Sequence, residues 1–133
     1  MLLFQMALNQ LHKFVNMDIT NLFGCSFFFH IDKFMKLVES HLKEQHSVQY
    51  YADKLCITPN YLNEIVTSTK GISAKQYIRN KVMDEAKRLL TYTDFPISDI
   101  AFELHFSTVS YFIRSFRQHT GKTPLLYRKA HKP

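Results

Sequence analysis

The 133-residue chain has little of what makes tight turns: it contains three glycines and four prolines, along with two cysteines and no tryptophan. β-Sandwiches and β-barrels need many such turns, so this composition disfavours both architectures. The hydrophobic share of 46% and the charged share of 21% are ordinary for a globular domain. We therefore expect an all-α fold.

The cysteines and the apolar segments argue against a disulfide-bonded, secreted or membrane-spanning protein. Cys25 and Cys56 have no CxxC spacing and no third cysteine beside them, which favours reduced thiols over a structural disulfide. The start, MLLFQMALNQL, resembles the apolar part of a signal peptide but lacks a basic beginning and a cleavage site. No apolar run reaches the roughly 18 residues that cross a bilayer. We expect a cytoplasmic protein without membrane contact.

Motifs for catalysis and for metal binding are also missing. The seven histidines are scattered, without a His-x3-His pair and without cysteines at zinc-finger spacing. The sequence has no glycine-rich phosphate loop and no Gly-x-Ser-x-Gly. Asp84 and Glu85 are adjacent, so on a helix they point to different faces and cannot act as a carboxylate pair. We expect no enzymatic activity, no metal and no cofactor.

Acidic residues are absent from the end of the chain. Residues 31–105 contain ten basic and ten acidic side chains, and residues 1–30 contain one of each. The formal charge of +6 therefore lies in the last 28 residues, on Arg114, Arg117, Lys122, Arg128, Lys129 and Lys132. A patch of one sign on a compact domain favours a polyanion such as DNA. A merely solvated basic tail is the alternative.

The chain contains an internal repeat, in which Ala52–Tyr77 matches Ala101–Tyr127. Leu55 recurs 49 residues later as Leu104. Further positions recur 50 residues later, namely Tyr61, Val66, Gly71, Ser73 and Tyr77 as Tyr111, Phe116, Gly121, Thr123 and Tyr127. The one-residue difference falls in the connection before the second helix of each copy, where it disturbs no apolar stripe. Chance is a poor explanation for this agreement.

The first copy, residues 47–71, predicts a helix, a tight turn and a second helix. Ser47 can cap the first helix. Thr58 followed by Pro59 is a strong start signal for the second, because it combines a hydroxyl N-cap with proline at the first helical position. Gly71 should end that helix.

The second copy, residues 96–121, predicts the same arrangement. Pro96 should open its first helix, Ser107 should cap its second helix, and Gly121 should end it. An apolar stripe of Ile78, Val82, Ala86 and Leu89 lies between the copies. It predicts one linker helix over about residues 73–91. Such a helix is roughly 27 Å long, comparable with the ~34 Å between successive major grooves on one side of B-DNA.

The beginning of the chain differs from the rest. Residues 31–42 place Ile31, Phe34, Val38 and Leu42 on one face, which predicts a leading helix that packs on the first copy. Residues 1–30 are interpreted as an N-terminal arm, with a helix from about Leu3 to Val15 followed by NLFGCSFFFH as an apolar connection. This arm could be a linker remnant, a self-association element or a segment folded back on the domain.

Residues 31–129 resemble the DNA-binding domain of the AraC/XylS family of bacterial transcription regulators. The second copy carries the resemblance through Ile100-Ala101, Phe106, Tyr111-Phe112, Arg114, Phe116, Gly121-Lys122-Thr123-Pro124 and Tyr127-Arg128. The wording YYADKLCITPNYL of the first copy looks like the Bacteroides-like branch of the family. The resemblance implies a homeodomain-like fold for residues 31–133: two helix-turn-helix subdomains joined by a long linker helix. His105 stands where the family usually has glycine in the turn, so that turn should be slightly strained.

The family resemblance also implies which residues meet DNA, with one recognition helix of each copy in each of two adjacent major grooves. Arginine reads guanine bidentately, asparagine reads adenine, glutamate accepts from cytosine, and valine can touch a thymine methyl group. The positions implied to read bases are Asn60, Asn63 and Glu64 in the first copy and Val109, Ser110, Tyr111 and Arg114 in the second. For Tyr111, a place in the core is the favoured reading.

Contacts to the DNA backbone are expected from helix starts and from the basic tail. The candidates are Ser47, Thr58, Ser107, Arg117, Lys122, Thr123, Arg128 and Lys129. For the hydroxyl residues, simple helix capping is the alternative, and both roles can hold together. RNA polymerase is a candidate partner, and self-association through residues 1–30 is a second candidate.

A protein-interaction module with a relic DNA face is the rival function. The acidic side chain of Glu64 and the neutral charge of residues 31–105 favour it, while the lack of acid after Phe106 favours DNA. The prediction is a DNA-binding transcription regulator that acts by binding. Family members usually carry a separate effector-binding or dimerisation domain upstream, which these 133 residues do not contain.

Overall fold

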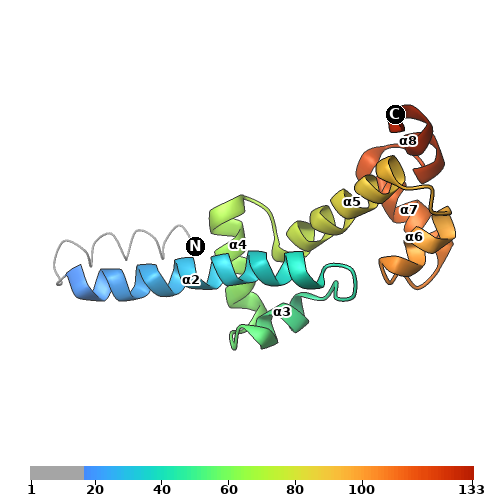
Figure 1. Ribbon diagram of the computed structural model, residues 1–133. Coiled ribbons are helices and arrows are strands. Elements are labelled where there is room, and N and C mark those ends of the chain that lie inside the picture. Colours follow the sequence, from blue (N-terminus) through green and yellow to red (C-terminus); the bar gives the residue numbers. More distant parts are fainter. Residues whose placement is uncertain (1–16) are drawn as a thin grey trace. The chain divides into compact units, whose positions relative to one another are not determined.

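A computed structural model describes the backbone of residues 17–133 and the side-chain surroundings from residue 27 onward. The described residues form helices and no strands, so the predicted all-α class is confirmed (Figure 1). The helices are α2 (Met17–His41), α3 (Val48–Lys54), α4 (Pro59–Lys70), α5 (Ala74–Tyr92), α6 (Ile97–Glu103), α7 (Val109–Thr120) and α8 (Pro124–His131). The helix predicted around Leu3–Val15 lies outside the described residues.

The described chain divides into two compact units, each with one helix-turn-helix. The first unit takes the described residues up to Ser40 together with Ser47–Tyr77, and therefore contains α3 and α4. The second unit takes His41–His46 together with Ile78–Pro133, and contains α6, α7 and α8. The predicted linker helix is α5, one residue later at each end than expected.

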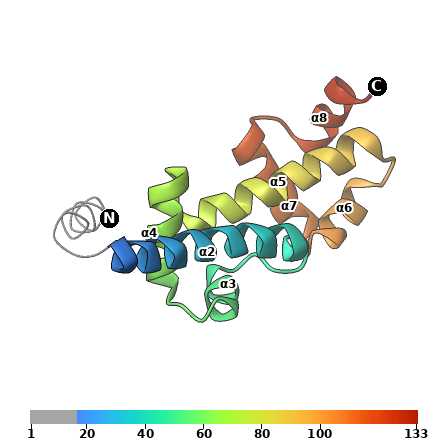
Figure 2. The ribbon, with the colours of Figure 1, turned by 60° about the vertical axis from the view of Figure 1, so that its left-hand side comes forward.

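The core of the first unit forms around Phe34 of α2, which is fully buried. Its ring centroid lies 5.8 Å from that of Tyr51 on α3 and 5.3 Å from that of Tyr77. Ile31 and Val38 are buried beside it, as their spacing predicts. Both views show α3 and α4 beside α2 (Figures 1 and 2). Aromatic side chains thus hold the first helix-turn-helix to the leading helix.

The sequence NLFGCSFFFH, interpreted above as a connection, is wrong as such: it belongs to α2, a single helix of 25 residues. The expected boundary at residue 30 therefore falls inside a continuous helix. Phe27, Phe28 and Phe29 are consecutive, which hides the helical period in the sequence. No proline interrupts residues 17–41, and a glycine such as Gly24 costs a helix only about 1 kcal/mol.

The second unit buries the predicted stripe of α5, with Ile78, Val82, Ala86 and Leu89 all at most 4% exposed. Ile100, Ala101 and Leu104 of α6 are also buried. A run of aromatic rings follows, in which Phe112 lies 5.0 Å from Phe106 and 5.9 Å from Phe116. Phe116 in turn lies 5.4 Å from Tyr127. Helix α7 is therefore fixed by rings on its inner face.

The turns use left-handed backbone at matching positions. Gly71 and Gly121 end α4 and α7 with φ of 75° and 82°, as predicted. His105 has φ of 57°, which agrees with the strained turn expected there. Cys56 also has φ of 57°. It stands 49 residues before His105, so the repeat alignment contained a signal for it that we missed.

Helix capping follows the prediction at Thr58 and departs from it at Ser107 and Ser47. Thr58 Oγ1 accepts from the backbone N–H of Tyr61 at 3.1 Å. The cap of α7 is Thr108, whose Oγ1 accepts from Tyr111 N–H at 3.0 Å, and not Ser107. The 50-residue offset places Thr108 opposite Thr58, and the extra residue of the second copy precedes it. Ser47 occupies the N-cap position of α3, but its side chain makes no capping hydrogen bond.

Candidate nucleic-acid interface

The outer face of α4 carries polar side chains in a row. Leu62, Ile65 and Val66 are buried on its inner face. Asn60 and Glu64 are exposed on the other side, four residues apart, so they are neighbours along one ridge. The predicted base readers Asn60 and Glu64 are thus accessible and lie together.

Asn63 is exposed as a residue but its amide has a partner in the fold. Its Oδ1 accepts a hydrogen bond from the backbone N–H of Ala74, at 3.0 Å, where α5 begins. Reading adenine requires the amide oxygen and the amide nitrogen together. Spacing alone gave no sign of this bond, because it joins residues 11 apart across a turn.

The outer face of α7 carries the basic counterpart. Phe112, Ser115 and Phe116 are buried on its inner face. Val109 is 37% exposed, and Ser110, Arg114 and Arg117 are exposed as well. The predicted base readers Val109, Ser110 and Arg114 are therefore accessible on one helix.

Tyr111 is 44% exposed, so the core placement favoured by the sequence is wrong. Phe106 packs between the two rings instead. Its ring centroid lies 5.8 Å from that of Tyr111 and 5.0 Å from that of Phe112. The Arg114 guanidinium lies 5.8 Å from the centre of the Tyr111 ring. A cation over an aromatic face is held in place by the ring quadrupole, so Tyr111 orients Arg114.

The side chains predicted to contact the DNA backbone fall into two groups. Some are exposed, and others make hydrogen bonds within the protein. Lys122 and Lys129 are exposed. Arg128 is half-buried: its Nε donates to the carbonyl of Leu90 at 3.1 Å and its Nη2 to that of Thr93 at 3.4 Å. Carbonyls at the C-terminal end of a helix lack partners within the helix, so Arg128 caps α5.

The hydroxyl candidates all lie at helix starts. Thr58 caps α4, and Thr123 caps α8 by accepting from Leu126 N–H at 3.3 Å. Ser47 and Ser107 are exposed, and neither makes a side-chain capping bond that the structure records. The capping alternative therefore holds for Thr58 and Thr123, and it leaves a phosphate contact open for each.

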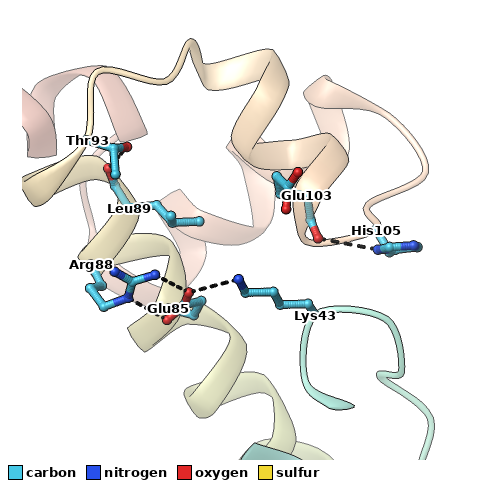
Figure 3. A network of polar contacts seen from close by, with 7 residues as sticks. All are labelled: Lys43, Glu85, Arg88, Leu89, Thr93, Glu103 and His105. Atoms are coloured by element: carbon cyan, nitrogen blue, oxygen red, sulfur yellow. Dashed lines mark hydrogen bonds and ion pairs between the residues drawn. The ribbon is translucent and has the colours of Figure 1, made fainter. Parts of the chain in front are cut away.

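A polar network that the sequence did not predict lies in the second unit (Figure 3). Arg88 donates to both carboxylate oxygens of Glu85, at 2.9 and 2.7 Å, and Lys43 Nζ lies 3.6 Å from the same carboxylate. The Arg88 hydrogen bonds lower the pKa of the Glu85 carboxyl. The charges of Arg88 and Lys43 act in the same direction, against the effect of burial. The network ties residues 41–46 to α5.

His46 packs against the turn that precedes α7. Its ring centroid lies 5.5 Å from that of Phe106, and its Nε2 is buried without a hydrogen-bond partner. Burial lowers the pKa of His46; the charge of His105 also lowers it, while backbone hydrogen bonds to Leu42 and Lys43 oppose the shift. The neutral imidazole is therefore the form that this packing favours.

Among the described residues, no group of three His, Cys, Asp or Glu side chains could hold a metal ion. None of the helices described is both long enough and apolar enough to cross a bilayer. Cys56 is an exposed free thiol, and the Cys25 side chain lies outside the described residues.

Two capped helix-turn-helix motifs, each with an accessible polar ridge on its second helix, define a DNA-binding helix-turn-helix protein. The sequence profile of a helix-turn-helix domain family matches residues 51–130. The chain therefore belongs to the AraC-type helix-turn-helix family. The family supports a sequence-specific DNA-binding domain of a transcription regulator, and the rival interaction module is not favoured. The Bacteroides-like branch stays a prediction.

Relatives with curated names are longer proteins. The chain is 30% identical over 97 residues to the regulatory protein PocR of Salmonella typhimurium, covering 73% of this chain and 32% of PocR. It is 32% identical over 98 residues to the HTH-type transcriptional regulator YtdP of Bacillus subtilis, covering 74% of this chain and 13% of YtdP. The chain thus spans about a third or less of these relatives.

Solved structures share the fold. The C-terminal domain of the two-component response regulator yesN from Fusobacterium nucleatum is 28% identical, with a TM-score of 0.62 over 71% of this chain and 96% of that one. The DNA-binding domain of AdpA, in complex with a target DNA, is 23% identical, with a TM-score of 0.69 over 74% and 89%. At that identity, the AdpA likeness concerns the fold alone.

Proposed function

We propose that α4 and α7 enter two adjacent major grooves on one side of a DNA duplex. The observation that carries this proposal is the pair of exposed ridges, with Asn60 and Glu64 on α4 and Ser110 and Arg114 on α7. The 19 residues of α5 span about 28 Å, close to the ~34 Å between successive grooves. Residues 31–133 form the DNA-binding part in this proposal.

Of the two recognition helices, α7 supplies most of the specific binding energy. Arg114 can read guanine bidentately, and its contact with Tyr111 orients it before DNA arrives. Val109, Ser110 and Tyr111 complete the reading surface of α7. In α4, Asn60 offers both ends of an amide, while Glu64 can only accept a hydrogen bond, from cytosine.

Phosphate contacts come from both units. Arg117, Lys122 and Lys129 are exposed donors near α7 and α8. Ser47, Thr58, Ser107 and Thr123 add hydroxyl groups at helix starts, where backbone N–H groups favour anions. Arg128 uses two of its five guanidinium donors on Leu90 and Thr93. It reaches phosphate only with the remaining three.

The protein acts by binding, without catalysis, in the cytoplasm where bacterial DNA lies. We propose activation through contact with RNA polymerase as its output. Self-association through residues 1–30 is supported by Phe28 and Phe29 of α2, which are 66% and 60% exposed. Exposed aromatic side chains of this kind often mark partner sites.

Salt dependence tests the DNA contact. We expect the affinity of the full chain for a fluorescent random-sequence duplex to fall steeply with salt. Each phosphate contact adds about −0.9 to the log–log slope. Fluorescence anisotropy between low and physiological salt measures it. A slope near zero would refute the proposed interface.

A further inference from the structure

The start of α5 has an unusual requirement. The first N–H groups of a helix lack partners within the helix. Ser73 Oγ accepts from Gln76 N–H at 3.1 Å, which satisfies one of them. Ala74 is fully buried, so its N–H cannot rely on water. The bond to Asn63 Oδ1, at 3.0 Å, satisfies that group instead, and without it a buried donor would be left unpaired.

The second unit meets the same requirement differently. The position equivalent to Ala74 is Pro124, which begins α8 and has no N–H. The position equivalent to Asn63 is Ile113, which has no acceptor. The donor and its acceptor are thus present together in one unit and absent together in the other. This pairing indicates that the asparagine serves the Ala74 N–H.

The hydrogen bond has a consequence for DNA reading. An N–H can be satisfied only by the oxygen end of the Asn63 amide, so that end is turned toward α5. Reading adenine needs the oxygen to accept from N6 while the nitrogen donates to N7. Asn63 cannot present both ends to a base without giving up the contact with Ala74.

The ridge of α4 that carries Asn60 and Glu64 extends to Thr67. Thr67 is exposed and follows Asn60 by seven residues and Glu64 by three, so the three side chains lie along one side of the helix. Their equivalents in α7 are Ser110, Arg114 and Arg117, all of which are exposed. The two helices therefore offer matching ridges once Asn63 is set aside.

We propose that Asn63 is a positioning residue that holds the start of α5, and that α4 reads DNA with Asn60, Glu64 and Thr67. This inference rests on the proposed function, because it concerns which side of α4 faces the duplex. It assigns Thr67 a role in specificity that the sequence analysis did not consider.

The test places the residues of the second unit, Ile113 and Pro124, at the equivalent positions 63 and 74 of the first unit. Asn63→Ile alone should lower the melting temperature of the full chain by roughly 4–8 °C, because it leaves the Ala74 N–H unpaired. Adding Ala74→Pro should recover most of that loss. The wild type and the double variant are then each used to select from a random-sequence duplex library, and the enriched DNA is sequenced. Both should enrich the same motif.

Two outcomes would overturn the positioning role. One is an unchanged melting temperature for Asn63→Ile. The other is a stable double variant whose motif has lost preference at one base pair, since a side chain that only holds the fold would not change base preference. If the double variant does not fold, Asn63→Asp replaces it, since a carboxylate keeps the acceptor but lacks the donor for adenine. It should keep the motif while binding all DNA more weakly.

A separate pair of variants tests the role of Thr67. The wild-type selection also tests the proposed function on which this inference rests. Thr67→Val removes the hydroxyl at nearly constant shape and should relax preference at one base pair. Thr69→Val is the matched control, because residue 69 points away from the ridge; an unchanged motif in Thr67→Val would remove Thr67 from the reading surface. If the wild type enriches no motif, the proposed function fails, while the melting temperatures still decide whether Asn63 holds α5.

Discussion

The two helix-turn-helix units follow the same backbone plan but use their polar side chains differently. In the first unit, Asn63 bonds within the fold and Glu64 brings a negative charge to the outer face of α4. In the second, Arg114 stands at the position of Glu64 and is held over Tyr111. The basic excess of the chain also lies after Phe106. The comparison teaches that a repeated fold does not give equivalent positions equal roles: α4 commits one polar side chain of its outer face to the fold, while α7 presents an oriented arginine.

The largest expected effect comes from removing the arginine of the second ridge. Arg114→Ala should weaken specific binding by roughly 10- to 100-fold, because a bidentate base contact contributes about 1–3 kcal/mol. It should also relax preference at one base pair. Titration against the selected duplex measures the change, with circular dichroism as the folding control. A larger cost for Asn63→Ala in the same titration would reverse the comparison.

Acid should destabilise the second unit through His46. Its pKa is lowered in the fold, so below its ordinary value of 6.5 the unfolded chain binds a proton that the folded chain does not. The contribution of His46 to the free energy of unfolding is therefore fully present above pH 6.5. Below that pH the free energy of unfolding falls by at most about 1.4 kcal/mol per pH unit for one group. Burial also lowers the pKa of His119, which adds a contribution of the same sign.

Urea unfolding at pH 7.5 and 5.5 measures this loss. Within that range Glu85 stays ionised, because its pKa is below its ordinary value. His46→Leu keeps an apolar group against Phe106 and should flatten the dependence. An equal slope in the wild type and in His46→Leu would assign the effect to other groups.

Helix caps should respond alike in the two units. Thr58→Ala and Thr108→Ala should each cost about 1 kcal/mol, because each removes the acceptor for an N–H of the first turn. Ser107→Ala is the matched control and should change the melting temperature little. A larger loss for Ser107→Ala than for Thr108→Ala would contradict the assigned cap.

The smallest effect is expected at the acid of the first ridge. Glu64→Gln removes a charge that phosphate repels, and should raise non-specific affinity by a few-fold at low salt. Screening should erase the gain at high salt. Anisotropy with a random duplex at two salt concentrations measures it. A fall in non-specific affinity would show that Glu64 accepts a hydrogen bond from DNA rather than repelling it.

The repeat explains why so much of the fold could be predicted. Gly71, Gly121, the cap at Thr58 and the stripe of α5 are local signals. Because the helix-turn-helix occurs twice, the signals of one copy support those of the other. The errors arose where local signals were ambiguous. Three consecutive phenylalanines concealed the course of α2, and two adjacent hydroxyl residues made Ser107 look like the cap.

The hydrogen bonds that candidate site residues make within the protein could not be predicted from the sequence. Asn63 meets Ala74 across a turn, and Arg128 meets Leu90 from 38 residues away. Spacing shows which side chains share a helix face, but not which distant backbone group a long side chain reaches. Polar residues that look available in a sequence are for that reason the ones whose roles depend most on the structure.

The contact of Arg128 with α5 determines where the chain can be cut. A version ending at Tyr127 loses both donors to the end of α5, so its failure to bind DNA would report damage to the second unit. A version ending at Arg128 keeps these donors but removes the last residues of α8, including His131, whose ring stacks on that of Tyr127 with 4.0 Å between the centroids. Lys132 also pairs with Asp94, so this shorter chain frees a carboxylate as well. The charges of Lys129 and Lys132 are therefore better removed by substitution than by shortening the chain.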